Sequence, residues 1–544
     1  MAEPISTALT VISAFKDVYL VSRFVKRTVR SSVHSSEERE HLIDEFNEQI
    51  LNLKNFWVIF RYYDGKIAPD AGLNEEWLKH IQKIIKELEI VFLEYTRDAQ
   101  LDPEYEEYLW LPGADNQHDL DTFPEDSPNT VAQVSSPEPE KPAKSSKSRW
   151  QWFSSSKVGQ STSRAVESVK WSLATKDKLE DTLRRFQRQN QKLQNLVPFI
   201  LASAPSQPSI ERSRIGNPKY EIFWPHLRLR QYTQSPESDM TEAGKALQIT
   251  SSELHMPRRL VERKCFNTET SDHVEIHVNQ LAVLLREAGS HNFRTLPFGG
   301  YLKDEGASCY DFYFEYPAGA LDLEPMSLHD LINDRRYRDR VSLPQRFRIA
   351  QAIAQSIGAF HSDGWVHKSI RSHAIKFFLT EESSPDLESP YLTDFEFSRP
   401  DGGYTAHIEH GLMDPERSAY RHPDRDMYGQ PTVSFNKVHD VYSLGVVLLE
   451  VGLWKTAGGM FEEIRTRLQA DDPQHRSPTN NSIRKRMKHI AGRELPHKMG
   501  EAYKDAVMTC LSDDFEKYHL GQDSFAITFE KSVAEMVDVK KLYE

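Results

Sequence analysis

The sequence contains little cysteine and no long apolar run. Its three cysteines, Cys265, Cys309 and Cys510, are widely spaced and odd in number, which argues against a disulfide framework and against a zinc site. We therefore expect reduced thiols in a cytoplasmic protein, because reducing compartments keep thiols unpaired. No run of about 18 apolar residues is present, so no helix is expected to span a bilayer. The N-terminus has neither the basic lead nor the cleavage site of a secretory signal.

An excess of positive charge is also missing. The 544 residues include 81 Asp and Glu but 68 Lys and Arg, and the formal net charge is −13. This balance argues against a general nucleic-acid binder, and we expect no nucleic-acid partner. Hydrophobic residues (38%) and aromatic residues (10%) suffice for packed cores, and the length predicts two domains and a linker.

The most informative segment is Gly364–Phe378, GWVHKSIRSHAIKFF. It resembles the H-R-D-x-x-x-x-N catalytic loop of protein kinases, in which the Asp accepts the substrate proton and the Asn holds a metal ion. Here His367 has the first position, Ser369 replaces the Asp, and Ala374 replaces the Asn. A neutral hydroxyl is no general base at neutral pH without a helper, and a methyl group cannot bind magnesium. Arg371 stands where Ser/Thr kinases have the loop Lys.

Other kinase-like motifs follow in the expected order. Leu343–Ser362 has the apolar spacing of a buried helix, and Asp394-Phe395-Glu396 stands where kinases carry D-F-G. The string YRHPDR, Tyr420–Arg425, occupies the place of A-P-E, and Asp440–Leu449 matches D-x-x-S-x-G at the start of a central helix. The order of these motifs indicates a kinase-like fold.

The phosphate-binding half is less complete. The string PRRLVERKCF, Pro257–Phe266, predicts a strand in which Lys264 would pair with phosphates; the alternative is a surface lysine on an amphipathic strand. The next predicted helix offers Gln280 near the place of the partner Glu, and an amide forms no ion pair. Between Tyr220 and Lys264 the only glycine is Gly244, so the glycine-rich phosphate loop is missing.

Only Lys264 and Asp394 therefore remain as candidates for a nucleotide site. Asp394 is the one candidate metal ligand, and the alternative is that it caps the turn before Ser398. We expect no required cofactor, while weak ATP–magnesium binding is compatible with these two residues. We do not expect phosphoryl transfer, because positioning and electrostatics supply nearly all of its catalysis.

The first part of the chain predicts helices at Ser6–Arg30, Ser36–Tyr62 and Leu73–Tyr95, and a later one at Trp171–Leu201. In the first helix a basic stripe opposes a valine face. Either this is a bundle helix with a solvated basic side, or it lies on an anionic membrane. The stripe is Lys16, Arg23, Arg27 and Arg30, and the face is Val11, Val18, Val21, Val25 and Val29.

The tract from about 112 to 156 is rich in Pro, Ser, Glu and Lys and has almost no aliphatic residues. Such a segment cannot bury enough apolar area to offset the entropy of ordering, so we expect it to be disordered.

Three strings resemble fungal proteins that join a HeLo-like helical domain to a protein-kinase-like domain: GWVHKSIRS, the stretch Pro390–Asp401, and SLGVVLLEVGLW. The chain departs from that group at Ala374, where an Asn is expected. The resemblance implies an α+β multidomain protein with an all-α bundle before a bilobal kinase-like domain. The expected bounds are 1–203 for the bundle with its insert at about 112–156, 204–216 for a linker, and 217–540 for the kinase-like domain (N-lobe about 217–318, C-lobe about 319–540).

The resemblance also implies a function. The architecture is similar to that of mixed lineage kinase domain-like proteins, so we expect a catalytically impaired regulator of a helical signalling, cell-death or oligomerisation module. Expected partners are other proteins of a signalling assembly, further copies of the chain through the helical domain, and an anionic membrane surface. The expected location is the cytoplasm, with peripheral binding to the plasma membrane on activation. The alternatives are a divergent active Ser/Thr kinase that binds ATP and a non-catalytic cytosolic scaffold.

Overall fold

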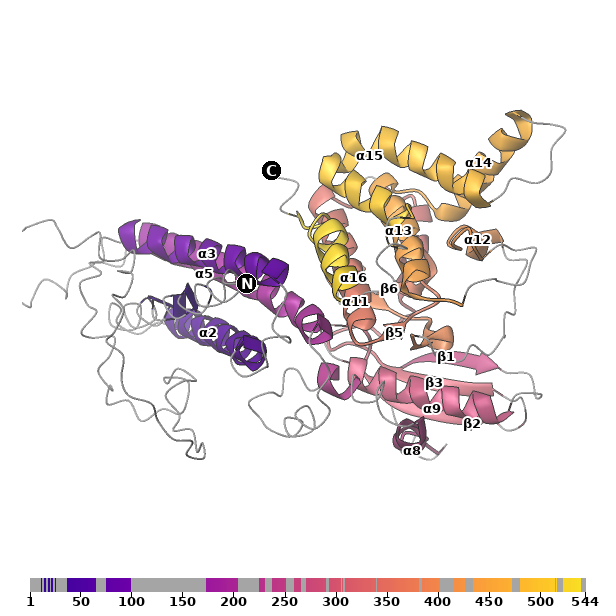
Figure 1. Cartoon of the computed structure of the whole chain (residues 1–544), viewed down its shortest axis with the longest axis horizontal. Coiled ribbons are helices and arrows are strands. Elements are labelled where there is room, and N and C mark those ends of the chain that lie inside the picture. Colours follow the sequence, from indigo (N-terminus) through magenta and orange to yellow (C-terminus); the bar gives the residue numbers. More distant parts are fainter. Residues whose placement is uncertain are drawn as a thin grey trace, which may run out of the picture. The chain divides into compact units, whose positions relative to one another are not determined.

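A computed structural model gives the architecture of the chain (Figure 1). The predicted insert, the predicted linker and the basic stripe of the first helix lie outside the described residues. The described residues are Val11, Ala14, Phe15, Val18, Tyr19, Val21, Ser22 and Val25 of an N-terminal helix, and 37–64, 75–98, 173–203, 225–229, 237–250, 259–265, 271–289, 293–304, 306, 309–338, 340–380, 384–401, 415–425, 434–471, 480–513, 515 and 522–539.

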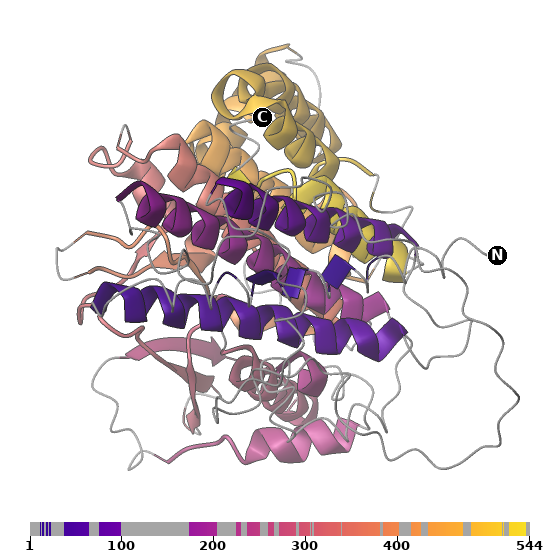
Figure 2. The same cartoon turned by 90° about the vertical axis from the view of Figure 1, so that its left-hand side faces the viewer.

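The chain divides into two compact units, Met1–Val197 and Pro198–Glu544, and the division falls inside a helix. The described part of the first unit is helical, and its long helices α2 (Glu37–Asp64), α3 (Glu75–Asp98) and α5 (Leu173–Ser203) run side by side (Figures 1 and 2). These bounds confirm the three helices predicted from apolar spacing, to within three residues at each end.

Aromatic packing joins the three helices. Phe186 of α5 contacts Phe46 of α2 and Phe92 of α3, with ring centroids 6.2 and 5.0 Å apart. Asn190 of α5 is buried and donates a hydrogen bond to the main-chain oxygen of Gln49, at 2.7 Å. Such a buried amide fixes the register of two helices, because leaving it unpaired would cost more than the bond contributes.

The N-terminal helix uses its apolar face inside this bundle. Val11, Val18 and Val25 are buried, and Phe15 contacts both Phe56 and Trp57 of α2. The valine face predicted from the sequence is therefore a packing face in this structure.

The second unit begins with helices and a three-stranded antiparallel sheet of order β1-β3-β2. In chain order its elements are α8 (Glu237–Lys245), β1 (Arg259–Cys265), α9 (Ser271–Ala288), β2 (Phe298–Asp304) and β3 (Cys309–Glu315). β3 is buried along most of its length, as the central strand should be. The strand predicted to carry Lys264 is β1.

The rest of this unit is mainly helical. Its helices are α10 (Leu328–Asn333), α11 (Leu343–Ser362), α12 (Pro415–Ser418), α13 (Lys437–Leu453), α14 (Ala457–Asp471), α15 (Asn480–Cys510) and α16 (Gln522–Phe529), followed by the π-helical turn η9 (Glu530–Ala534). Two small antiparallel sheets lie among them: β4 (Met326–Ser327), β6 (Ile375–Phe377) and β7 (Tyr391–Leu392) form one, and β5 (Trp365–Val366) with β8 (Arg399–Pro400) forms the other. The fold is therefore α+β with small antiparallel sheets.

Helices α11 and α13 form the centre of the unit, and both match their predicted positions. α11 begins with a capping box in which Ser342 and Gln345 satisfy each other's backbone amides. α13 is buried on all sides from Val438 onward, in accord with its almost unbroken apolar sequence. Among the described helices none is long and apolar enough by itself to cross a membrane; α13 and most of α14 meet that criterion only together, across a bend of 95°.

The cysteine prediction was wrong. Cys265 and Cys309 form a disulfide, whereas Cys510 is a buried free thiol. The antiparallel register of β1 and β3 places the two half-cystines directly opposite each other, with their Cα atoms 4.0 Å apart. The two cysteines are 44 residues apart in the sequence, and that spacing does not indicate that they pair. The cysteines therefore give no support to the expectation that the protein lies in a reducing compartment.

Gly244 has a packing role rather than a phosphate-binding one. It lies in α8, and a Cβ atom there would lie 2.5 Å from the Cα atom of Asn279 on α9. Asn279 in turn accepts a hydrogen bond from the hydroxyl of Tyr301 on β2, at 2.8 Å. The glycine thus lets α8 approach α9 closely enough to cover the helix and the sheet edge.

We predict that Gly244→Ala destabilises the chain by roughly 1–3 kcal/mol, the usual cost of overpacking. Gly492 of α15 is the matched control, because nothing lies within 4 Å of the position its Cβ would take. Gly492→Ala should leave stability unchanged or raise it by up to about 1 kcal/mol, through helix propensity. Urea unfolding of both variants checks this, and equal midpoints would contradict the packing role.

Candidate functional site

The segment predicted to be a degenerate catalytic loop lies between β5 and β6 and is held by one carboxylate. Asp440, near the start of α13, is fully buried and accepts hydrogen bonds from the backbone amides of His367 (2.7 Å) and Lys368 (2.9 Å). His361 of α11 contacts the same carboxylate at 3.2 Å. Burial would raise the pKa of Asp440, but these bonds outweigh it and the pKa is lowered. Asp440 is therefore ionised and fixes the loop.

His367 has a structural role in this loop. Its ring is buried and lies 4.7 Å from the ring of Phe395, and its Nδ1 accepts a hydrogen bond from the amide of Ser369 at 3.2 Å. Burial lowers the pKa of His367 to about 4. Lys368 has a positive φ of 66°, so the backbone turns sharply after His367. The imidazole is neutral at physiological pH and supports the turn that presents Ser369.

The two positions that carry chemistry in a kinase hold side chains that cannot perform it. Ser369 lines a small pocket, and among the described residues no carboxylate or imidazole is hydrogen-bonded to its hydroxyl. Ala374 is fully buried, and its main-chain oxygen accepts hydrogen bonds from the amide and hydroxyl of Thr393. The structure thus gives Ser369 no base and places a methyl group where a metal ligand would be needed.

Asp394 does not act as a cap. It occupies the residue before the 3-10 turn η7 (Phe395–Phe397) in a left-handed conformation, but its side chain makes no capping bond. Instead its carboxylate binds the guanidinium of Arg371 at 2.6 Å. The backbone amides of Asp394 and Phe395 donate to the carboxylate of Glu262 on β1, at 2.9 and 3.3 Å. The predicted capping role is therefore wrong, and the carboxylate is already neutralised by a cation.

Lys264 lies close to the same turn. It is 6% exposed, so the alternative of a surface lysine is wrong. Its Nζ atom lies 5.8 Å from the centre of the Phe397 ring, three residues beyond Asp394. Gln280 lies half-buried on α9, the helix that follows β1. The structure therefore places Lys264 next to η7. Asp394, just before η7, is joined to the loop 367–374 by its ion pair with Arg371.

A second carboxylate ties the loop to the segment before α13. Glu450 of α13 is fully buried and accepts hydrogen bonds from the hydroxyls of Ser372 (3.0 Å) and Tyr420 (2.9 Å) and from the amide of Ala457 (2.7 Å). Burial raises the pKa of Glu450 to about 8, against the lowering effect of these donors. No sequence pattern had marked this residue, because it sits within a continuous apolar run.

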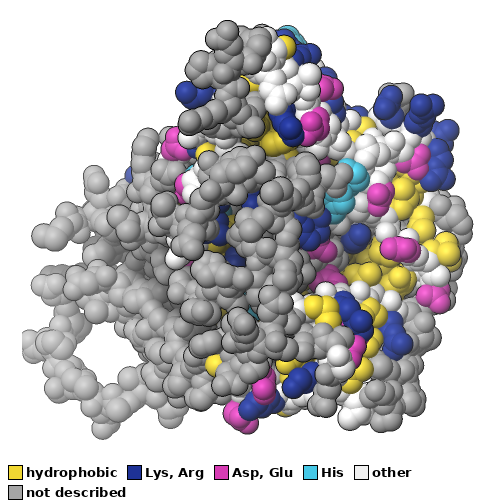
Figure 3. All heavy atoms as spheres, turned by 90° about the vertical axis from the view of Figure 1, so that its right-hand side faces the viewer, with side chains coloured by type: hydrophobic (Ala, Val, Ile, Leu, Met, Phe, Trp, Pro, Cys, Tyr) yellow, Lys and Arg dark blue, Asp and Glu magenta, His cyan; other side chains and the backbone are white. Residues whose placement is uncertain are grey.

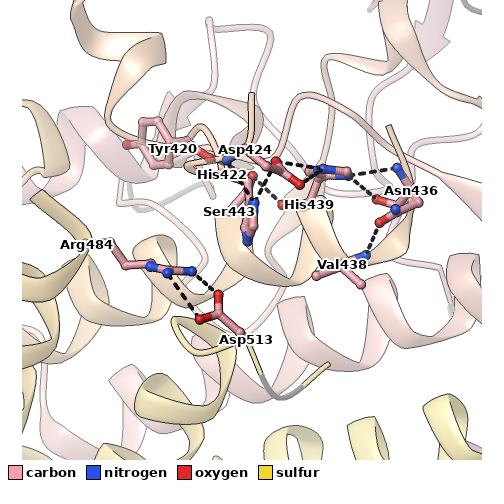
Figure 4. A network of polar contacts seen from close by, with 9 residues as sticks. All are labelled: Tyr420, His422, Asp424, Asn436, Val438, His439, Ser443, Arg484 and Asp513. Carbon is pink, nitrogen blue, oxygen red and sulfur yellow. Dashed lines mark hydrogen bonds and ion pairs between the residues drawn. The ribbon is translucent and has the colours of Figure 1, made fainter. Parts of the chain in front are cut away.

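Two histidines and an aspartate gather beside Tyr420 (Figure 4). Asp424 accepts from Nδ1 of His422 at 2.7 Å and from Nε2 of His439 at 3.1 Å. Burial would raise the pKa of Asp424, but these two bonds lower it well below its usual range. The three residues could hold a metal ion by distance alone. Ser443 lies beside them and donates to the main chain of Tyr420 or His439.

The hydrogen bonds favour a different role for this cluster. The backbone amide of Asn436 donates to Nδ1 of His439 at 2.8 Å, so the ring proton sits on Nε2 and points toward Asp424. A metal ion would need the lone pair of that same Nε2 atom. The cluster is therefore best explained as part of the capping box of α13, linked through Asp424 to the segment 420–425. In the same view Arg484, near the start of α15, pairs with Asp513, three residues beyond the end of that helix.

No protein-family model matches the chain, and no curated protein matches it significantly. The chemistry must therefore be judged from the residues themselves. They provide a hydrogen-bonded loop, a buried lysine and an ion-paired aspartate, and the described residues include no base that is hydrogen-bonded to the Ser369 hydroxyl.

We predict that Glu450→Gln flattens the dependence of stability on pH. The unfolded chain loses the Glu450 proton near its ordinary pKa of 4.5, but the folded chain keeps it until about pH 8. The folded state thus binds more protons between these values, so stability falls as pH rises through this window, by up to about 1.4 kcal/mol per pH unit.

Urea unfolding of wild type and Glu450→Gln between pH 5 and pH 8 isolates this contribution, since other titrating groups are common to both. The wild type should lose stability relative to the variant as pH rises. Glu501→Gln, at a side chain that is 71% exposed, is the control and should not change the slope. Parallel curves for wild type and Glu450→Gln would contradict the assignment.

Proposed function

We propose that the second unit is a protein-kinase-like module that does not transfer phosphate, and that it regulates the helical first unit. The arrangement of the loop supports this. Asp440 holds the backbone of His367 and Lys368, and the His367 ring packs on Phe395. In chain order β1 with Lys264, helix α9, strands β2 and β3 and the central helices follow one another. The strand with Lys264, the helix after it and the central helices are the elements that the kinase-like motifs predict.

The observation that carries the proposal is the ion pair between Arg371 and Asp394, at 2.6 Å. In a kinase the corresponding Asp binds magnesium, and the catalytic loop supplies a base and an Asn. Here the carboxylate is neutralised by Arg371, the base is replaced by Ser369, and the Asn is replaced by Ala374. The residues do not fit a magnesium–ATP complex poised for transfer, so we derive no phosphoryl-transfer step.

We predict no phosphotransfer at ordinary kinase rates, measured as radiolabel transfer from ATP to generic substrates and to the protein itself. Ser369→Asp alone should not create activity, because the Asn and the glycine-rich loop are also missing and such groups act as a unit. Transfer that is abolished by Lys264→Met would contradict the proposal and favour the divergent-kinase alternative.

The regulated partner in this proposal is the N-terminal helix. Its valines Val11, Val18 and Val25 are buried, and Phe15 contacts Phe56 and Trp57 of α2. A role on an anionic membrane therefore requires this helix to leave the bundle, and we propose that the kinase-like unit controls that release. The proposed location is the cytoplasm, with peripheral membrane binding on activation, and the proposed partners are signalling proteins and further copies of the chain. The buried valine face is also the observation that favours a cytosolic scaffold, the second candidate.

We predict that a fragment of residues 1–203 binds vesicles that contain anionic lipid and releases a trapped dye, whereas the full chain does so weakly. Replacing Lys16, Arg23, Arg27 and Arg30 by Gln should reduce binding at low salt, since each basic side chain near an anionic surface contributes about 1 kcal/mol. Circular dichroism confirms that each fragment is helical before the assay. A folded fragment that ignores anionic vesicles and does not self-associate would leave the scaffold as the better explanation.

A further inference from the structure

A disulfide closes the end of strand β1, the outer strand of the described three-stranded sheet. Cys265 is the last residue of β1 and Cys309 is the first residue of β3, and the two lie directly opposite each other in the antiparallel register. Cys309 is 4% exposed, whereas Cys265 is exposed. Thiol–disulfide exchange requires a thiolate to reach one of the two sulfur atoms, so Cys265 is the half-cystine open to attack.

The two faces of β1 make different contacts. Because successive side chains of a strand point to opposite faces, Cys265 shares the exposed face with Arg263, while Glu262 and Lys264 lie on the other face. Arg263 forms a bidentate ion pair with Asp311 of β3, at 2.6 and 2.7 Å. On the exposed face, therefore, the disulfide and this ion pair join β1 to β3 at successive positions.

The ion pair is the weaker of these two links. The Arg263 side chain is 53% exposed, and an exposed ion pair contributes little to stability. Charged side chains are also not special to this strand, since basic and acidic groups are interspersed over the face shown in Figure 3. A covalent bond between the strands persists until a redox reaction breaks it, so the disulfide is the link that fixes the end of β1.

The other face of β1 holds the turn η7. The carboxylate of Glu262 accepts hydrogen bonds from the backbone amides of Asp394 and Phe395, at 2.9 and 3.3 Å. Lys264, one residue before the disulfide, is buried, and its Nζ atom lies 5.8 Å from the centre of the Phe397 ring. The disulfide therefore fixes the strand whose side chains contact η7.

From this arrangement we propose that Cys265–Cys309 is a thiol–disulfide exchange site whose reduction by a low-molecular-weight thiol releases the turn η7. A thiolate of the reductant attacks Sγ of Cys265, the S–S bond breaks, and Cys309 leaves as a thiolate that takes up a proton. A second thiolate then attacks the reductant's sulfur in the mixed disulfide, which frees Cys265 as a thiol. Two reductant thiols are thus oxidised to one disulfide for each protein disulfide that is reduced.

Reduction should loosen the end of β1 without unfolding the unit. The strand then keeps its backbone bonds to β3 and the ion pair of Arg263, and the ends of elements open locally at a lower free energy than the core does. Glu262 lies three residues before Cys265, so local opening withdraws its carboxylate from η7. The loop after β5 is held separately by Asp440 of α13. This exchange site goes beyond the proposed function, because it requires neither a loss of phosphotransfer nor a membrane role.

Hydrogen exchange of the full chain, oxidised or incubated with millimolar reduced glutathione, tests the coupling. Alkylation of the folded protein followed by mass spectrometry counts the thiols. We expect Cys265 and Cys309 to be alkylated only after reduction, while Cys510 stays protected because it is buried. In the reduced protein the amides of Asp394 and Phe395 should exchange about tenfold faster or more, the effect of losing a hydrogen bond to a charged group.

The amides of His367 and Lys368 are the internal control, because they bond to Asp440 instead of β1. Their exchange should be the same in both redox states. Equal acceleration at these amides and at positions 394–395 would indicate general unfolding and would overturn the proposal.

Matched variants distinguish a redox response from a general loss of stability. Cys265→Ser, or Cys309→Ser if the first does not fold, should show fast exchange at positions 394–395 without glutathione and no further response to it. Cys510→Ala is the control and should keep the full response. Glu262→Ala should give fast exchange in both redox states, whereas Glu262→Gln should recover part of the protection, since its amide oxygen still accepts a hydrogen bond. Thermal unfolding verifies that each variant is folded.

The remaining outcomes decide the proposal. Faster exchange on reduction that is confined to η7 and is lost in the Cys265→Ser variant supports it. A disulfide that the folded protein keeps at millimolar glutathione overturns it, and so do cysteines that cannot be oxidised in the folded chain. Reduction that leaves exchange at positions 394–395 unchanged also overturns it. None of these results depends on whether phosphotransfer or vesicle binding is detected, so this proposal and the proposed function fail separately.

Discussion

The buried carboxylate of Asp440 is the interaction on which the second unit depends. It is completely removed from solvent, yet it receives two backbone amides and an imidazole. A buried charge is tolerated only when such donors replace its water, and removing them would leave an uncompensated ion. The carboxylate therefore couples α11, α13 and the loop after β5 into one body, and the positions of His367 and Ser369 follow from that coupling.

In this loop, the atoms that hold the backbone in place differ from the atoms that a kinase would use for catalysis. The loop is held by its backbone amides, by the His367 ring and by the Phe395 ring. Catalysis would use the side chains at positions 369 and 374, which face the cavity or the core without helping to hold the loop. Substitutions at these two positions should therefore cost the fold little. Glu450 also holds the loop, through hydrogen bonds from Ser372 and Tyr420, and these bonds do not involve the side chains at positions 369 and 374.

Local pattern predicted local structure well and long-range pairing poorly. Apolar spacing placed α11 and α13, because a helix buries residues at a fixed period that can be read along the chain. The Cys265–Cys309 disulfide depends on the register of two strands that are separated in the chain by a helix and a third strand, and nothing local encodes that register. The partner of Asp394 was missed for the same reason: Arg371 lies 23 residues away and reaches it only through the folded loop. Gly244 could not be assigned to packing until α9 was in place.

The absence of phosphotransfer that we propose has an electrostatic basis in the ion pair between Arg371 and Asp394. A phosphotransfer site balances its cations with carboxylates that hold metal ions and accept protons. Here Ser369 removes one carboxylate, and Arg371 neutralises another, Asp394. A carboxylate that is already bonded to a guanidinium is a poor ligand for a metal ion, so in the proposed function neither the base nor the metal ligand of a transfer site is present.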